Sequence, residues 1–309
     1  MKIVALAGGV GGAKLADGLA QVLPPEDLTV IVNTGDDFEY LGLHISPDLD
    51  TVCYTLAGLS NPRTGWGRAD DTFHVLENIH NLGGPDWFRI GDKDIATHVE
   101  RTRHLREGQN LDRITRDFCL SWGVKHSILP MSNDPIHTFV DTVEFGELPF
   151  QEYFVHRHCE PMVRGFRFEG IESACAAPGV LKAIEAAEAL VICPSNPWVS
   201  IDPILRIKGI RTALAVKCLA AVSPIIGGQT VKGPAAKMYA ELGFQPSALA
   251  IAKHYQDLLG GLIIDRIDAS LEKTILQMGI TPFSTDTIMK TAEDRRRLAQ
   301  DVLNFIQTI

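Results

Sequence analysis

The chain has no arrangement of cysteines that is typical of a disulfide framework or a structural metal site. It contains six cysteines, none of them in a Cys-x-x-Cys pair. Several, such as Cys193, lie in apolar runs where cysteine behaves as a small hydrophobic residue. Residues 156–159 (His-Arg-His-Cys) lack a second ligand cluster at a suitable spacing. The pattern favours a reducing compartment over a secreted disulfide scaffold.

Long hydrophobic runs are missing too. The most apolar stretch, residues 212–228, is interrupted by Lys217 and Pro224, so no transmembrane helix is expected. The apolar N-terminus meets Gly8 and then Lys14, which leaves it too short for a signal peptide. We therefore expect a cytoplasmic protein.

The chain is also short of positive charge. Its 38 acidic and 29 basic side chains give a net charge of −9. The densest basic run, residues 295–297, falls in an expected amphipathic helix, where a solvated face explains it better than a nucleic-acid surface. We expect neither nucleic acid nor membrane as a partner. A 45% apolar and 22% charged composition excludes general disorder.

The sequence does contain an alternation of apolar strands and amphipathic helices. The expected strands are residues 2–7, 28–32, 126–129, 189–193, 222–226, 262–265 and, more weakly, 280–283. The expected helices are residues 13–23, 178–187, 234–242, 247–255 and 291–306. The alternation predicts an α/β fold with a doubly wound, mostly parallel Rossmann-like sheet.

We expect a single Rossmann-like domain over residues 1–309 that carries two additions. Residues of about 60–124 are rich in helix formers and charge without a good strand, which predicts a mainly helical insertion. Residues of about 136–178 are expected to add short strands and a helix, as a small subdomain that covers the site.

A glycine-rich loop, residues 8–14 (Gly-Gly-Val-Gly-Gly-Ala-Lys), follows the first strand and opens a helix. Glycines let the backbone approach phosphate oxygens, and free N–H groups at a helix start bind anions. We expect Gly9, Gly11, Gly12 and Lys14 to bind phosphate or nucleotide. The loop departs from both the dinucleotide and the Walker pattern. The alternative is a loop that only lets the helix pack closely on the strand.

Asp36, Asp37, Asp48 and Asp50 fall within 15 positions, in expected loops after the second strand. Such loops lie at the carboxyl edge of a parallel sheet, beside the glycine loop. Two interpretations stay open: Asp50 or Thr51 caps a following helix, or the carboxylates hold Mg²⁺ with diphosphate oxygens. A plain NAD site would instead use Asp36 to bind ribose.

Three more segments are candidates for ligand contact. Residues 87–94 place Arg89 beside aromatic residues, which suits a flat ring with a phosphate or hydroxyl, or a surface turn. Residues 130–135 and 194–197 each end an apolar strand with small polar residues. Such turns offer hydroxyl, amide and backbone donors to a ligand, or are simple strand exits.

Together these segments resemble the 2-phospho-L-lactate transferase family of deazaflavin coenzyme F-420 biosynthesis. The resemblance extends from the first strand to at least Asp265 and is most specific in Gly-Leu-x-Ile-Ser-Pro-Asp-x-Asp-Thr at residues 42–51. The segments that carry it are residues 8–14, 33–37, 42–51, 87–94, 128–132 and 194–203.

The resemblance implies a transfer reaction. The 2-phospho-L-lactyl group, or enolpyruvyl phosphate in some relatives, moves from lactyl-2-diphospho-5′-guanosine to the ribityl hydroxyl of 7,8-didemethyl-8-hydroxy-5-deazariboflavin, and GMP is released. Mg²⁺ is the implied cofactor, and we expect a homodimer.

The resemblance also implies roles for particular residues. Asp50 is the catalytic candidate, and the expected metal ligands are Asp37, Asp48 and Asp50. The expected deazaflavin contacts are Asp50, Arg89, Met131 and Ser132. Ser195 and Asn196 join the glycine loop in binding the guanosine nucleotide.

Two other functions remain open at this point. A distantly related regulator with a similar glycine loop would bind a nucleotide sugar without turnover. An NAD-dependent dehydrogenase would need a base and a hydride-acceptor geometry that the sequence does not reveal, and Lys14 weakens the dinucleotide fingerprint.

Overall fold

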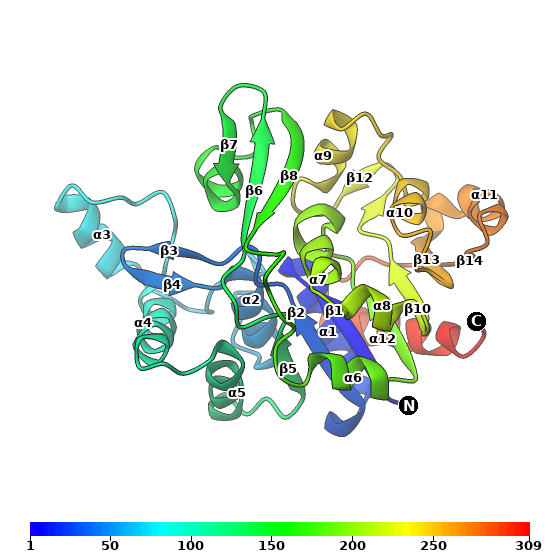
Figure 1. The fold of residues 1–309 in the computed structure, drawn as a ribbon, viewed down its shortest axis with the longest axis horizontal. Helices are drawn as coiled ribbons and strands as arrows, with labels where there is room; N and C mark the ends of the chain where they lie inside the picture. Colours follow the sequence, from blue (N-terminus) through cyan, green and yellow to red (C-terminus); the bar gives the residue numbers. More distant parts are fainter.

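The computed structural model describes residues 1–309 and is built around a seven-stranded sheet (Figure 1). The strand order is β14-β13-β10-β9-β1-β2-β5, and every neighbouring pair is parallel. The strands are β1 (Ile3–Ala7), β2 (Leu28–Val32), β5 (Ser127–Pro130), β9 (Ala189–Ile192), β10 (Cys218–Val222), β13 (Gly261–Asp265) and β14 (Thr281–Thr285). The predicted doubly wound, mostly parallel α/β fold is confirmed.

Helices cover both faces of this sheet, so the strands are apolar on both sides. Alternate residues of β1 enter different cores: Val4 and Leu6 join one cluster, whereas Ile3 and Ala5 join the other. The helices are α1 (Gly9–Val22), α2 (Pro47–Leu56), α6 (Val180–Ala186), α7 (Asp202–Arg206), α8 (Ile210–Leu214), α9 (Ala235–Glu241), α10 (Ala248–His254), α11 (Glu272–Gln277) and α12 (Ala292–Ile306). Helix α1 packs between α2 and α12.

One strand was predicted in the wrong place. The apolar run at residues 222–226 is not a strand of the sheet, because β10 ends at Val222. Pro224 has no N–H for a ladder, and the Ser223 hydroxyl bonds both the N–H and the C=O of Ile225 in a turn. Beyond it lies a small hairpin of β11 (Ile225–Ile226) and β12 (Gln229–Thr230).

The segment between β2 and α2 also differs from the expected loop. It contains a short hairpin of β3 (Phe38–Tyr40) and β4 (Leu43–Ile45), joined through Leu41 and Gly42, which both have positive φ. Helix α2 then begins at Pro47, so Asp48 and Asp50 lie in its first turn and not in a loop. Carboxylates are favoured there by the helix dipole. The predicted cap at Asp50 or Thr51 is wrong, since Ser46 is the N-cap residue.

Two additions flank the sheet (Figure 1). The first contains α3 (His74–Asn81), α4 (Asp92–Arg106) and α5 (Leu111–Ser121). The second corresponds to the expected covering subdomain and is called that below. It is an antiparallel sheet in the order β7-β6-β8, and its strand β8 packs on α9. Its elements are β6 (His137–Thr142), β7 (Gly146–Pro149), the π-helical turn η2 (Glu152–His156) and β8 (Val163–Glu169).

The remaining short helical turns connect the larger elements. They are η1 (Pro25–Asp27), η3 (Pro197–Ile201) and η4 (Arg266–Leu271). None of the helices combines the length and the apolar character that a membrane crossing requires.

Candidate functional site

Several of the expected site residues lie directly after the carboxyl ends of four adjacent strands. In the order β9-β1-β2-β5, the turn after β9 carries Ser195, and the glycine loop follows β1. Asp36 and Asp37 follow β2, and Met131 follows β5. The topology therefore brings these segments to one edge of the sheet, where parallel α/β folds bind ligands.

The glycine loop is held tightly by its neighbours. The Gly8 N–H donates to Ser195 Oγ at 3.1 Å, and that hydroxyl donates back to the Gly8 carbonyl at 2.8 Å. A methyl group on Gly11 would overlap the carbonyl oxygen of Pro194, and one on Gly12 would overlap Ser195 Oγ. These two glycines therefore let α1 approach the turn after β9, as the packing interpretation requires.

The same loop leaves main-chain donors free. The Gly9 N–H donates to Asp48 Oδ1 at 2.7 Å. The N–H groups of Val10 and Gly11 have no partner in the protein. They stand in the first turn of a 14-residue helix, where the dipole also favours an anion. Close packing and anion binding are thus compatible in this loop.

Asp48 connects the glycine loop to the end of β2. Its Oδ2 accepts a hydrogen bond from Asn33 Nδ2 at 3.0 Å, while Oδ1 accepts from Gly9. Burial raises the pKa of Asp48 to about 6, and Asp37 adds to the rise, against the two hydrogen bonds. The carboxylate is therefore costly to keep charged without further positive charge nearby.

Several buried side-chain oxygens in the loop after β2 and on β6 have no hydrogen-bond partner in the protein. They belong to the side chains of Thr34, Asp36, Asp37 and Thr138. Burial, together with the charge of Asp48, raises the pKa of Asp36 well above its usual value. Unpaired buried polar atoms call for water or an ion, and carboxylate and hydroxyl oxygens are the ligands that Mg²⁺ prefers. The unpaired oxygens around Asp37 are thus of the chemical kind that binds a cation, but they do not form a ready-made cluster of metal ligands.

Asp37 is itself anchored on one side. Its Oδ2 accepts from the Ser46 hydroxyl at 2.7 Å and lies 3.1 Å from His44 Nε2, which leaves Oδ1 without a partner. His137 approaches the Asp37 main-chain carbonyl at 3.0 Å. The free oxygen is therefore held in place by contacts from two segments, residues 44–46 and β6.

Asp50 has a different environment. Both of its carboxylate oxygens bond the guanidinium group of Arg101, which is only 3% exposed. In this arrangement a metal ion would share Asp50 with an arginine. The structure contains no group of three or more His, Cys, Asp or Glu side chains arranged to hold a metal ion.

Arg89 lies in the insertion, apart from the hydrogen-bonded cluster around Asp48. Its guanidinium group is 4.4 Å from the ring centre of Phe73 in a shallow surface hollow, and it has no carboxylate partner. The neighbouring aromatic cluster packs around Ile45 and Ile90. Its rings are Phe38, Tyr40, Trp87 and Phe88.

The other predicted contacts are engaged within the protein. Lys14 Nζ donates to the Met289 carbonyl at 2.7 Å. Ser132 Oγ donates to the Cys175 carbonyl at 2.6 Å, and Met131 is fully buried. Asn196 Oδ1 accepts from the Trp198 N–H at the start of η3. The hydrogen bonds of Lys14, Ser132 and Asn196 direct these side chains to protein partners and not into an open site.

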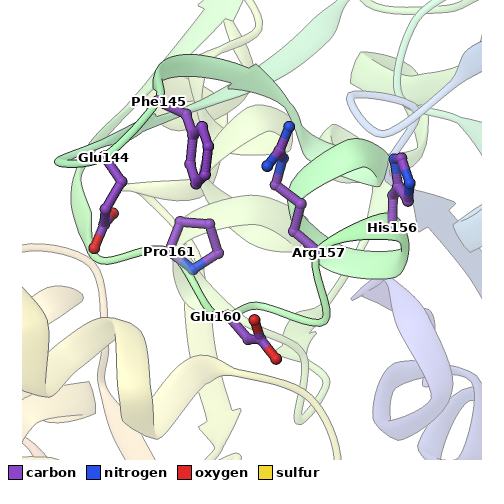
Figure 2. Close-up of a pocket in the computed structure, with 6 residues that line it drawn as sticks. All are labelled: Glu144, Phe145, His156, Arg157, Glu160 and Pro161. Carbon is purple, nitrogen blue, oxygen red and sulfur yellow. The ribbon is translucent and has the colours of Figure 1, made fainter.

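A second surface hollow lies on the covering subdomain (Figure 2). Arg157 stacks over the ring of Phe145 there, at 4.0 Å from its centre. The lining residues are Glu144, Phe145, His156, Arg157, Glu160 and Pro161. None of them was predicted as a site residue.

Sequence reasoning missed Asn33, His98 and Arg101. Asn33 directly follows β2, in the position from which ligand-binding loops begin. A signal for the other two existed, because Asp94, His98 and Arg101 recur at steps of four and three residues on one face of α4. Polar residues on an inward face of a helix indicate a buried network.

A model of the family described as "2-phospho-L-lactate transferase CofD" matches residues 3–303. The chain belongs to this family. A phosphoenolpyruvate transferase from Streptomyces griseus is 42% identical over 316 residues, covering 100% of this chain and 99% of the relative. A 2-phospho-L-lactate transferase from Methanosarcina acetivorans is 39% identical over 307 residues, covering 99% and 100%. Transferase membership and the link to F-420 biosynthesis, both expected from the resemblance, are confirmed.

The fold of the family is also found in a solved structure. A member of the upf0052 family from Bacillus halodurans has a TM-score of 0.65 with 15% sequence identity, and covers 98% of each chain. At this identity the likeness concerns the fold alone.

Proposed function

We propose that the protein transfers the 2-phospho-L-lactyl group, or enolpyruvyl phosphate, from a guanosine diphosphate donor to the ribityl hydroxyl of 7,8-didemethyl-8-hydroxy-5-deazariboflavin. The hydroxyl oxygen attacks the phosphorus that bears the three-carbon acid. The bond from that phosphorus to the bridging oxygen breaks, GMP leaves with the bonding electrons, and the hydroxyl loses its proton.

The observation that carries the proposal is the direct contact between the glycine loop and the carboxylates. The free N–H groups of Val10 and Gly11 stand one and two residues after Gly9, whose own N–H bonds Asp48. Displacement at a diphosphate concentrates negative charge on its oxygens, and preorganised N–H groups stabilise such charge. The loop therefore suits the donor's diphosphate.

Mg²⁺ fits the same edge of the sheet. When bound, it would supply positive charge to the diphosphate oxygens and the leaving group. Asp37, Asp48 and Asp50 would hold it, although the three carboxylates would first have to move together, since they do not form a ready-made metal site. The raised pKa of Asp48 is the kind of shift that a nearby cation reverses. Ser46, Asn33 and Gly9 keep these carboxylates in place.

The remaining assignments follow the same reaction. Arg89, beside aromatic rings, would bind the deazaflavin together with Asp50, Met131 and Ser132.

Gly9, Gly11, Gly12, Lys14, Ser195 and Asn196 would surround the guanosine nucleotide. Lys14, Asn196 and Ser132 would have to exchange their present protein partners for the ligand, and Met131 would have to become accessible.

We also propose that the protein is a cytoplasmic homodimer. Apolar side chains are exposed on the covering subdomain at Val143, Phe145, Phe154 and Met162, which suits a surface that a second copy covers. Sedimentation velocity at micromolar concentration would measure the mass, and a monomer there would reject the dimer.

Turnover by the purified protein tests the proposed activity. The protein is mixed with the deazaflavin, Mg²⁺ and either the lactyl or the enolpyruvyl donor, and the coupled product and GMP are quantified by mass spectrometry. One equivalent of GMP per product is expected. The two donors are compared because relatives of both names resemble the chain to a similar degree.

A regulator that binds a nucleotide sugar is the other candidate function. It predicts no product with either donor, and a rise in unfolding temperature with a UDP-sugar but not with GDP and Mg²⁺. This pair of results would reject the transferase.

A further inference from the structure

A buried row of polar side chains lies where α4 packs near α2. Asp94, His98 and Arg101 come from α4, and Asp50 and Tyr54 come from α2. His98 and Arg101 are 2% and 3% exposed. Burying charged groups is costly unless they are paired and hydrogen-bonded, so the complete set of partners decides what this row does.

Arg101 holds the carboxylate of Asp50 at two points. Nη1 donates to Oδ2 at 3.0 Å, and Nη2 donates to Oδ1. A planar guanidinium that bonds both oxygens fixes the plane of the carboxylate as well as its position. Each oxygen keeps lone-pair capacity for one more contact. The ion pair therefore orients Asp50 without using up its ability to accept.

Arg101 is in turn supported from behind. His98 Nδ1 lies 3.3 Å from Arg101 Nη1, and a guanidinium can only donate, so Nδ1 accepts and Nε2 carries the ring proton. Nε2 faces Asp94 Oδ1 at 3.5 Å, and the Tyr54 hydroxyl donates to the same oxygen at 2.7 Å. His98 in direct contact, with Asp94 and Tyr54 behind it, thus supports the guanidinium that fixes Asp50.

We propose that Arg101 is a positioning residue that holds the Asp50 carboxylate in its working orientation for group transfer. This inference rests on the proposed function, in which Asp50 acts at the reaction centre. A purely structural ion pair, which would only fasten α4 to the first turn of α2, is the alternative. The two differ because orientation affects turnover in protein that is fully folded.

Two substitutions separate orientation from charge. Arg101→Lys keeps the positive charge but loses the two-point contact, and Arg101→Ala removes both. Arg103→Ala is the matched control, since Arg103 lies on the same helix but is exposed and pairs with Glu100 and Glu107. Thermal unfolding, kcat and KM for both substrates are measured for each variant.

The expected result is a loss of kcat without loss of the fold. Misplacing a reacting group by about 1 Å can cost about 100-fold, so kcat should fall by about that factor in Arg101→Ala, with both KM values within a few-fold. Arg101→Lys should fall less, and Arg103→Ala should match the unmodified protein. If Arg101→Lys is folded and turns over normally, the positioning role is wrong.

Chemical rescue of kcat distinguishes the two roles, because it is expected if Arg101 orients Asp50 and not if Arg101 is only structural. Millimolar guanidinium should enter the space left in Arg101→Ala and raise kcat at least about tenfold, because it restores the two-point contact. It should not raise kcat in Arg103→Ala or Asp50→Asn. If Arg101→Ala is folded and guanidinium leaves its low kcat unchanged, the proposal fails.

Asp50→Asn distinguishes failure of this inference from failure of the proposed function. If Asp50→Asn turns over normally, Asp50 has no part in the reaction, and the assigned site is wrong. If Asp50→Asn loses turnover while folded Arg101 variants keep it, the site stands and only the positioning role of Arg101 is rejected.

Discussion

At the scale of single residues, Asp48 is the point where the glycine loop and the carboxylates meet. Its pKa, raised to about 6 by burial, exceeds the value near 4 expected in the unfolded chain. Protonation of Asp48 therefore stabilises the folded protein. This stabilisation is complete below about pH 4 and is lost as the pH rises through about 6. Without metal or substrate, this carboxylate works against folding at neutral pH.

We predict that the Mg²⁺-free protein becomes more stable as the pH falls from 7.5 to 5.5, and that Asp48→Asn flattens this dependence. The full shift corresponds to about 3 kcal/mol of free energy of unfolding, gained by about pH 4, and about 1 kcal/mol of it falls between pH 7.5 and 5.5. Urea unfolding at each pH would measure it. Asp257→Asn, at an exposed position, is the control. If the free energy of unfolding depends on pH as steeply in Asp48→Asn as in the unmodified protein, Asp48 is charged at little cost.

At the scale of elements, the contact between α1 and the turn after β9 defines the glycine loop. The obstacle at Gly11 is a main-chain carbonyl, that of Pro194, which cannot rotate away as a side chain can. A methyl group at this position must therefore displace the first turn of α1. The same displacement would move the free N–H groups of Val10 and Gly11.

We predict that Gly11→Ala costs about 1–3 kcal/mol of stability, as overpacking does, and weakens the binding of GDP with Mg²⁺. Thermal unfolding and calorimetric titration would measure the two effects. Gly165→Ala on β8 is the matched control, because its added carbon meets nothing within 4 Å and its φ is ordinary. If Gly11→Ala binds GDP with normal affinity, the glycine loop does not bind the diphosphate.

The elements also show what the sequence could predict. β1, β2 and β13 are continuous apolar runs, because both faces of a parallel sheet are buried, and their bounds were predicted to within a residue. The hairpin of β3 and β4 was missed because three-residue strands are too short for a periodic pattern.

The candidate site was also predicted only in part: its place in the fold was predicted, but not all of its contacts. The edge rule for parallel sheets placed the glycine loop beside Asp36 and Asp37. The partner of Asp50 could not be predicted, since Arg101 lies 51 residues away along the chain and the contact depends on how α4 packs. Contacts between an insertion and the sheet are fixed by tertiary packing, which leaves little trace in local sequence.

At the scale of the whole molecule, the two additions meet beside the sheet. Trp87 of the insertion stacks on His156 of the covering subdomain, with ring centres 5.3 Å apart. Arg89 lies two residues from Trp87, on the insertion side. In the proposed arrangement, the tricyclic acceptor would place its ribityl hydroxyl at the glycine loop and its rings toward Arg89. The donor, by contrast, would be bound through its diphosphate at the sheet edge.

We predict that Arg89→Ala raises KM for the deazaflavin by about tenfold or more and leaves KM for the guanosine donor nearly unchanged. The physical reason is the loss of one charge-assisted hydrogen bond to the acceptor alone. Steady-state kinetics with each substrate varied in turn would measure it. Arg113→Ala, an exposed residue of α5, serves as control and should change neither constant. A larger rise for the donor would place Arg89 at the nucleotide end of the site and reverse the assigned order of the two substrates across the molecule.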